Sequence, residues 1–207
     1  MKLSCSYLSS DDKEKTIKEL NESKTDYIHL DIMDGIFVKE ETLDFNTLRN
    51  YFYENKKKLD IHLMVKNVKL YTDLYSLLNP EFITFHIEVG NTLELINYIK
   101  NKNIKVGIAI KPNTNVEVLK PYIDKIDLVL IMSVEPGYGG QKFIEKTIEK
   151  ITKIRNMKKD IIISMDGGIN KDNINKIKEK EVDMCVIGSY ITKSNIKEKI
   201  IELKDYL

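Results

Sequence analysis

The segment HLDIMDG, from His29 to Gly35, has the residue types and spacing of a metal-binding strand end. It follows a β-branched and aromatic run and closes on a glycine, which is typical of a strand that runs into a loop. Alternate side chains of a strand share a face, so His29, Asp31 and Met33 point one way and the apolar residues between them point the other. A histidine and an aspartate in this position are poor core residues but good ligands for a metal ion.

Two further strand ends carry the same kind of chemistry. The segment DIHLMV, residues 60–65, places His62 and Met64 on one face. The segment SMDGG places Asp166 before two glycines, where it would either form the turn or face the same cavity as Asp31. Strands that end in the same chemistry predict one shared site.

Two imidazoles and two carboxylates would suit a single divalent ion, either zinc, iron(II), manganese or cobalt. The predicted ligands are His29, Asp31, His62 and Asp166. Such an ion would polarise an adjacent carbonyl and stabilise an enediolate. Asp31 and Asp166 lie on separate strands, so each could serve one face of a small substrate and together move a proton from one face of a carbon to the other. We therefore expect them to be the catalytic acid and base.

The remaining histidine, His86, lies on the next predicted strand. It has no carboxylate two residues before it, although Glu88 follows two residues after it. A single histidine on a strand is usually a core residue satisfied by hydrogen bonds. His86 is predicted to support the site rather than to bind the metal.

Glycine-containing turns follow the sixth, seventh and eighth predicted strands. Glycine lets backbone N–H groups approach an anion closely, and in barrel folds the last two of these loops often bind phosphate. The substrate contacts predicted in these turns are Gly137, Tyr138, Gly139, Gly140, Gly167, Gly168, Gly188 and Ser189.

Three methionines, Met33, Met64 and Met132, lie near the ends of runs that face the same way as the candidate ligands. One interpretation is that they fill the core. The other is that they form an apolar, polarisable collar that keeps water away from the reacting carbon.

Composition excludes several classes of partner. The chain has 207 residues, with 33 basic and 32 acidic side chains and a net charge of +1, so neither nucleic acid nor an anionic membrane is favoured. Cys5 and Cys185 lie far apart in predicted strands, which does not suggest a disulfide framework. No apolar run has the length of a membrane span or a signal peptide. We expect a cytoplasmic protein.

Apolar, β-branched runs recur eight times, with segments of helical period between them. This is the pattern of a (β/α)8 barrel, here predicted as a single domain spanning residues 1–207. An open doubly wound sheet is the alternative, but no glycine-rich dinucleotide fingerprint follows the first strand. The predicted strands are 2–8, 27–33, 59–65, 82–89, 105–111, 128–134, 161–166 and 184–189; among the predicted helices are 12–21, 93–101, 144–157 and 172–180.

The chain resembles the ribulose-phosphate 3-epimerase family in a series of motifs that occur in order: HLDIMDGIFV, DIHLMV, TFHIE, VGIAIKP, IMSVEPGYGGQKF, MDGG and IGS. The resemblance implies a barrel that interconverts D-ribulose 5-phosphate and D-xylulose 5-phosphate by inverting C3 through a 2,3-enediolate. It implies that the four candidate ligands bind the metal, with His62 and Asp166 also beside the substrate. It further implies that Ser6 contacts the sugar end of the substrate. The family is generally oligomeric, so a homo-oligomer is expected.

The chain departs from the family pattern in two places. The first strand usually carries Pro-Ser-Ile-Leu, where this chain has Cys5-Ser6-Tyr7-Leu8. After the second strand the family commonly continues Phe-Val-Pro-Asn, where this chain has Phe37-Val38-Lys39-Glu40. Both segments would frame the substrate.

Three alternatives remain open. A 3-epimerase for D-allulose 6-phosphate would keep the chemistry and need room for one more hydroxymethylene. The second alternative is a sugar-phosphate decarboxylase on a related barrel. Those enzymes resemble one another in an Asp-x-Lys-x-x-Asp motif, but here Met33 occupies the position of the lysine, two residues after Asp31. A non-catalytic phosphate-binding barrel is disfavoured, because both candidate acids and all four candidate ligands are present.

Overall fold

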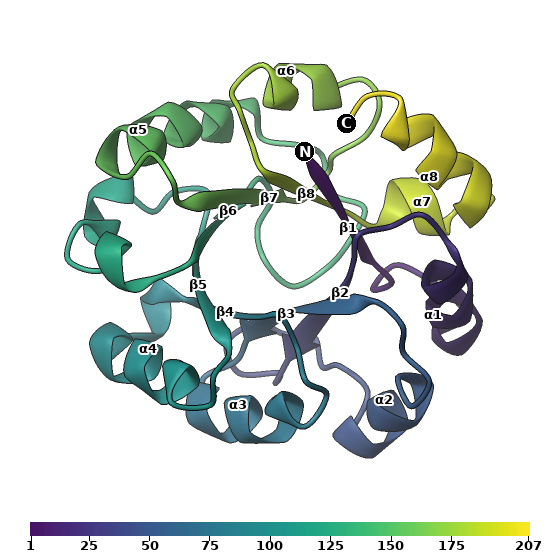
Figure 1. Cartoon of the computed structure of the whole chain (residues 1–207), viewed down its shortest axis with the longest axis horizontal. Helices are drawn as coiled ribbons and strands as arrows, with labels where there is room; N and C mark the ends of the chain where they lie inside the picture. Colours follow the sequence, from purple (N-terminus) through teal and green to yellow (C-terminus); the bar gives the residue numbers. More distant parts are fainter.

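Eight parallel strands follow one another around a closed barrel, each paired with its neighbours in sequence and the eighth paired with the first. The computed structural model describes all 207 residues, and Figure 1 views the barrel close to its axis. The strands are β1 (Lys2–Ser6), β2 (Tyr27–Met33), β3 (Lys58–Met64), β4 (Phe82–His86), β5 (Lys105–Ile110), β6 (Leu128–Met132), β7 (Ile162–Asp166) and β8 (Met184–Ile187).

Helices surround the barrel (Figure 1). The α-helices are α1 (Lys13–Glu22), α2 (Phe45–Tyr51), α3 (Val68–Ser76), α4 (Thr92–Lys100), α5 (Glu149–Met157), α6 (Ile174–Lys178), α7 (Ser189–Thr192) and α8 (Ile196–Lys204). Short 3₁₀ segments are η1 (Ile87–Val89), η2 (Val116–Leu119), η3 (Ile123–Lys125) and η4 (Glu145–Ile148). No helix is both long and apolar enough to cross a membrane.

The barrel prediction is confirmed and the open sheet is wrong, because β8 closes onto β1. Several predicted ends differ from the structure. β1 ends at Ser6 rather than at residue 8, and β4 gives way to η1 after His86. The β5–β6 connection contains η2 and η3 and no α-helix. Pro112 and Pro121 lie in this connection, and proline lacks the N–H that a helix interior requires.

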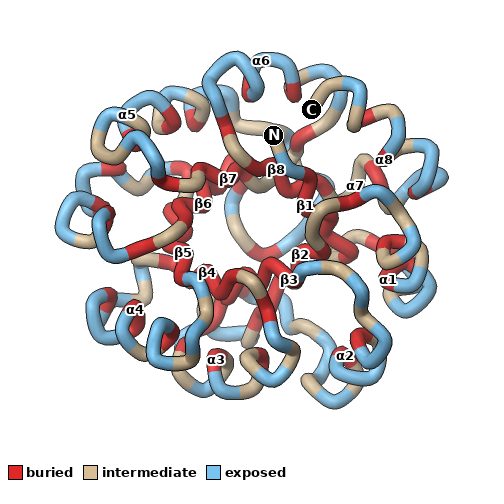
Figure 2. The backbone as a smooth tube through the Cα atoms, viewed as in Figure 1, coloured by how far each residue is buried: buried red, intermediate tan, exposed pale blue.

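The outer faces of the strands pack against the helices in one large core. On β2, for example, Leu30 and Ile32 are fully buried in this core together with Ile17 and Leu20 of α1. In Figure 2 the buried residues, in red, form a ring along the strands, and the exposed residues of the helices lie outside it. Burial of apolar surface at about 25 cal/mol per Å² makes this layer the main source of stability.

The inside of the barrel is divided in composition. Strands β5, β6 and β8 contribute a small apolar cluster that includes Ala109, Leu130 and Val186. Strands β1 to β4 instead place most of the buried polar side chains of the strands: Ser4, Ser6, His29, Asp31, Asp60, His62, Thr84 and His86, with Ser164 added by β7. Buried polar groups are costly unless paired, so this half of the interior is where function is expected.

Candidate metal and sugar-phosphate site

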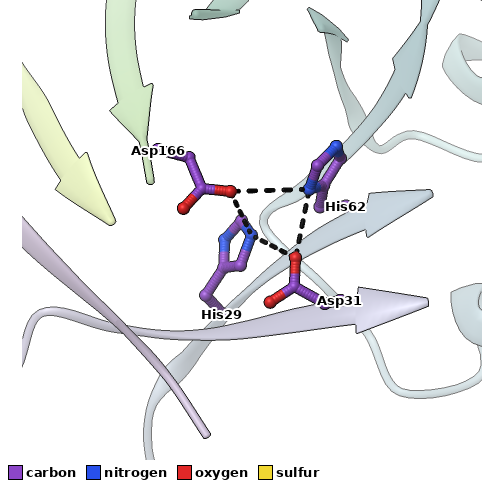
Figure 3. Close-up of side chains that lie close together, drawn as sticks. All are labelled: His29, Asp31, His62 and Asp166. Carbon is purple, nitrogen blue, oxygen red and sulfur yellow. Dashed lines mark hydrogen bonds and ion pairs between the residues drawn. The ribbon is translucent and has the colours of Figure 1, made fainter. Parts of the chain in front are cut away.

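The four predicted ligands lie together inside the barrel; Asp31, His62 and Asp166 lie towards the carboxyl ends of their strands, and His29 lies mid-strand in β2 (Figure 3). Asp31 of β2 pairs in register with His62 of β3, and His29 lies two residues before Asp31 on the same face. Asp166 ends β7, which is reached from β2 through β1 and β8. One candidate ligand atom from each side chain lies within 4.8 Å of the others.

The contacts identify which ring nitrogen of each histidine faces the carboxylates. Nε2 of His29 lies 3.3 Å from Oδ1 of Asp31 and 3.9 Å from Oδ2 of Asp166. Nδ1 of His62 lies 3.2 Å from Oδ1 of Asp31 and 3.8 Å from Oδ2 of Asp166. Both imidazoles are fully buried, so these nitrogens and carboxylates converge away from bulk water.

This donor set fits a divalent metal ion. Nε2 of His29 is buried and has no hydrogen-bond partner, although it points at two carboxylates. An unpaired buried polar atom is costly in a folded protein, and binding of a cation would satisfy it. Imidazole and carboxylate ligands suit several first-row divalent ions, so this group could hold a metal ion but does not select which one.

The charges of this cluster shift the pKa values of its members. Burial alone would lower the pKa of His29, but the carboxylates of Asp31 and Asp60 raise it well above its ordinary value. Burial alone would raise the pKa of Asp31, but the imidazoles of His29 and His62 hold it well below its ordinary value. Burial and the nearby Asp31 charge raise the pKa of Asp166 to about 6. Acidic surroundings of this kind favour a cation at the centre.

Asp60 is a functional candidate that the sequence reasoning missed. Its Oδ2 lies 2.7 Å from Nδ1 of His29 and accepts a hydrogen bond of 3.0 Å from Oγ of Ser4. An Nδ1–H donated to Asp60 leaves Nε2 of His29 free as a ligand, an arrangement that recurs around metal-bound histidines. The signal was present, because Asp60 precedes His62 by two residues and so shares its face of β3.

Ser6 contacts one of the predicted acids. Its Oγ donates a hydrogen bond of 2.8 Å to Oδ2 of Asp31 and accepts one from the backbone N–H of Leu8. Asp31 therefore has one oxygen held by a hydroxyl and the other directed at the histidines. Ser6, Asp31 and Asp166 all line the same pocket.

The glycine turns complete this pocket. Its lining includes every residue predicted in the turns: Gly137, Tyr138, Gly139, Gly140, Gly167, Gly168, Gly188 and Ser189. Gly167 and Gly168 have φ angles of +117° and +66°, and a Cβ at Gly168 would lie 2.6 Å from the backbone nitrogen of Phe143. Only glycine suits this close packing of two loops. The turns thus surround a concave, glycine-rich rim of the kind that receives anions.

The three methionines lie close to the same site. Met64 and Met132 line the pocket, whereas Met33 lines the adjacent cavity next to Asp31. Each side chain is at most 4% exposed, and Met33 packs with Met64 and Val38. This placement is compatible with both interpretations, core packing and an apolar collar.

Comparison with known proteins agrees with the geometry. Residues 2–192 match the family model described as the ribulose-phosphate 3-epimerase family. A ribulose-phosphate 3-epimerase of Helicobacter pylori is 36% identical over 207 residues, covering 98% of this chain and 95% of that protein. Another of Buchnera aphidicola is 40% identical over 186 residues, covering 86% and 82%. The chain belongs to the ribulose-phosphate 3-epimerase family.

Solved structures support the fold of this family member. A 3-hexulose-6-phosphate synthase from Salmonella typhimurium aligns with a TM-score of 0.74 over 100% of this chain and 98% of its own, at 13% identity. Identity this low supports the barrel alone. The resemblance by motifs and the prediction of an isomerase are confirmed by the family match.

The two departures from the epimerase family pattern lie in different surroundings. Tyr7 is only 3% exposed, packs against Phe52 and lines the cavity next to Asp31. Glu40 instead lies in the loop after β2, with Oε2 2.8 Å from the position that a Cβ would occupy on Gly137. The loops after β2 and β6 therefore meet at the mouth of the site.

Proposed function

We propose that this protein interconverts D-ribulose 5-phosphate and D-xylulose 5-phosphate by inverting C3 through a 2,3-enediolate. The observation that supports this most is the placement of two carboxylates, Asp31 and Asp166, on strands three steps apart around one pocket. Inversion at carbon requires a base on one face and an acid on the other. The proposed substrate, a ribulose phosphate, is taken from the names of the family and of its relatives.

Asp31 and Asp166 are proposed to exchange these roles with the direction of reaction. Their surroundings push their pKa values apart: that of Asp31 is held low, whereas that of Asp166 is raised to about 6. Two carboxylates with separated pKa values suit an acid–base pair, because one can hold a proton while the other accepts one. Ser6 fixes Asp31 through Oδ2 and is proposed to contact the sugar end of the substrate.

One divalent ion is proposed to bind the cluster His29, Asp31, His62 and Asp166. When bound, it would supply Lewis-acid polarisation of the carbonyl and stabilise the negative charge of the enediolate. Zinc, iron(II), manganese and cobalt all suit these ligands. His62 and Asp166 are also proposed to lie beside the substrate.

The glycine turns after β6, β7 and β8 are proposed to bind the phosphate through backbone N–H groups. The turn residues and Ser189 at the start of α7 lie in the same pocket as Asp31 and Asp166, which fits a phosphate at one end and the reacting carbon at the other. Met33, Met64 and Met132 are proposed to exclude water from that carbon. Assembly into a homo-oligomer, a cytoplasmic location, the absence of a nucleic-acid partner and a single domain over residues 1–207 stay predictions from the sequence.

A coupled assay tests both the substrate and the metal. We expect D-ribulose 5-phosphate to be epimerised with a kcat/KM at least tenfold above that for D-allulose 6-phosphate, since one additional methylene alone changes discrimination by roughly 10- to 200-fold. Treatment with a chelator should abolish turnover, and addition of divalent metal should restore it. A higher kcat/KM for D-allulose 6-phosphate would favour the alternative epimerase, and full activity without metal would contradict the metal site.

A further inference from the structure

A second hydrogen-bonded chain leads away from the metal cluster on the side of His62. Nε2 of His62 lies 2.9 Å from Nε2 of His86, and Nδ1 of His86 lies 3.2 Å from Oε2 of Glu88. Both imidazoles are fully buried, whereas the Glu88 side chain is 22% exposed. Three side chains thus connect the cluster to the edge of the barrel.

The carboxylate at the outer end fixes the direction of these hydrogen bonds. A bond between two imidazole nitrogens needs one N–H donor and one lone pair. If His86 donated from Nε2, its neutral ring would present a lone pair at Nδ1 to the Glu88 carboxylate, which is repulsive. Glu88 therefore favours a proton on Nδ1 of His86, so that Nε2 of His86 accepts from Nε2–H of His62. Nδ1 of His62 is then the nitrogen left to bind a divalent ion at the Asp31 and Asp166 carboxylates; without an ion it lies 3.2 Å from Oδ1 of Asp31, at hydrogen-bond distance.

Glu88 is itself held in place by the connection after β5. Its Oε1 accepts hydrogen bonds from the backbone N–H of Lys111, at 2.9 Å, and from the hydroxyl of Thr114. These contacts occupy one oxygen and leave Oε2 for His86. Glu88 also lies in η1, a short turn that ends at Gly90 with a φ of +81°. The carboxylate is therefore fixed by local backbone and by a neighbouring loop.

We infer that Glu88, acting through His86, is a positioning residue that sets the tautomer of His62 so that Nδ1 can bind the divalent ion. This inference rests on the proposed metal site. Each of the two metal-binding histidines would then be oriented by a carboxylate. Asp60 contacts His29 directly, whereas Glu88 acts on His62 through the imidazole of His86. Loss of such an outer partner typically lowers metal affinity 10- to 100-fold.

The first test measures affinity for Zn²⁺ by competition with a chelator in the full-length protein. We expect Glu88→Leu and His86→Phe each to weaken zinc binding 10- to 100-fold. His86→Gln retains an oxygen that can accept from Nε2–H of His62, so its affinity should recover to within several-fold of the unaltered protein. Thr114→Val is the matched control, since it removes one contact of Glu88 but leaves Oε2 free for His86.

The second test reads the tautomer without any metal. In the metal-free protein at pH 8, nitrogen NMR of the histidine rings should show His86 protonated at Nδ1 and not at Nε2, and Glu88→Leu should abolish this preference. Thermal unfolding establishes that each variant is folded. Unchanged zinc affinity in folded Glu88→Leu and His86→Phe, or a His86 proton on Nε2 in the unaltered protein, would overturn the inference. Failure of the proposed metal site is distinguishable, because then His62→Ala would not weaken zinc binding either.

Discussion

At the scale of single residues, the site depends on how much space and charge each position tolerates. Gly188 precedes α7 at the proposed phosphate position, and a Cβ built on it would lie 3.4 Å from its nearest neighbour, in Ser6. That distance is an ordinary contact for a Cβ. A small neutral side chain is therefore tolerated there, whereas a carboxylate would meet the phosphate.

We predict that Gly188→Asp raises KM for the sugar phosphate by tenfold or more, because the carboxylate would repel the bound phosphate. A tenfold change corresponds to about 1.4 kcal/mol of lost binding energy. Gly188→Ala is the control and should change KM by less than threefold. Steady-state kinetics of the three proteins check this prediction. An unchanged KM in folded Gly188→Asp would place the phosphate elsewhere.

The residues differ in how far sequence could reveal them. His29, Asp31, His62 and Asp166 were predictable, because each stands in or at the end of an apolar strand, where buried polar residues are costly. Asp60 was missed although its spacing from His62 places it on the same face of β3, because its contact with His29 depends on the register of two strands. The Glu88 chain likewise follows from the orientation of two imidazole rings, which spacing alone does not fix.

At the scale of elements, a close approach between β4 and β5 helps to shape the barrel interior. Gly107 of β5 pairs in register with Thr84 of β4, and a Cβ on Gly107 would lie 2.2 Å from Oγ1 of Thr84. Oγ1 of Thr84 is buried and has no hydrogen-bond partner. Glycine within a strand often marks such a close contact.

We predict that Gly107→Ala lowers the free energy of unfolding by about 1–3 kcal/mol through overpacking. In the double variant Gly107→Ala/Thr84→Ala, about 1 kcal/mol or more of this loss should be recovered, since residues in contact couple by roughly 0.5–3 kcal/mol. Urea unfolding of both single variants and the double variant measures the coupling. Additive effects would contradict the proposed clash.

The elements also show what periodicity can predict. The strand pattern located all eight strands, because apolar runs of fixed length alternate with helical segments. The ends were less accurate, as at β1, which ends at Ser6, and at β4, which is followed directly by η1. The β5–β6 connection was not predicted as 3₁₀ structure, since its two prolines allow several turn conformations.

At the scale of the whole molecule, one ion-pair cluster connects the beginning and the end of the chain. Asp26, just before β2, accepts hydrogen bonds from Lys2 and from the backbone N–H of Leu3 in β1, and from Lys204 of α8. Burial alone would raise the pKa of Asp26, but these donors lower it from 3.8 to about 2. Its side chain is 19% exposed, so solvent screens the cluster only in part.

We predict that Asp26→Asn destabilises the protein by about 1–2 kcal/mol at pH 7. Because the folded pKa lies below the unfolded one, this stabilisation is fully present above about pH 4 and is lost as the pH falls towards 2. Unfolding measured at pH 7 and near pH 2 should therefore show a difference only at the higher pH. Asp124→Asn, at an exposed position, is the control. An equal loss at both pH values would refute the electrostatic origin.

The central claim is that Asp31 and Asp166 serve opposite faces of one carbon, and hydrogen exchange at C3 tests it most directly. In deuterated water, Asp31→Asn and Asp166→Asn, each checked for bound metal, would be incubated with each epimer and followed by NMR. We predict that interconversion falls by roughly 10²–10⁴-fold in both variants. Residual exchange of the C3 hydrogen should occur in one epimer for Asp31→Asn and in the other for Asp166→Asn. Exchange of the same epimer by both variants, or interconversion near the rate of the unaltered protein, would contradict the two-acid account.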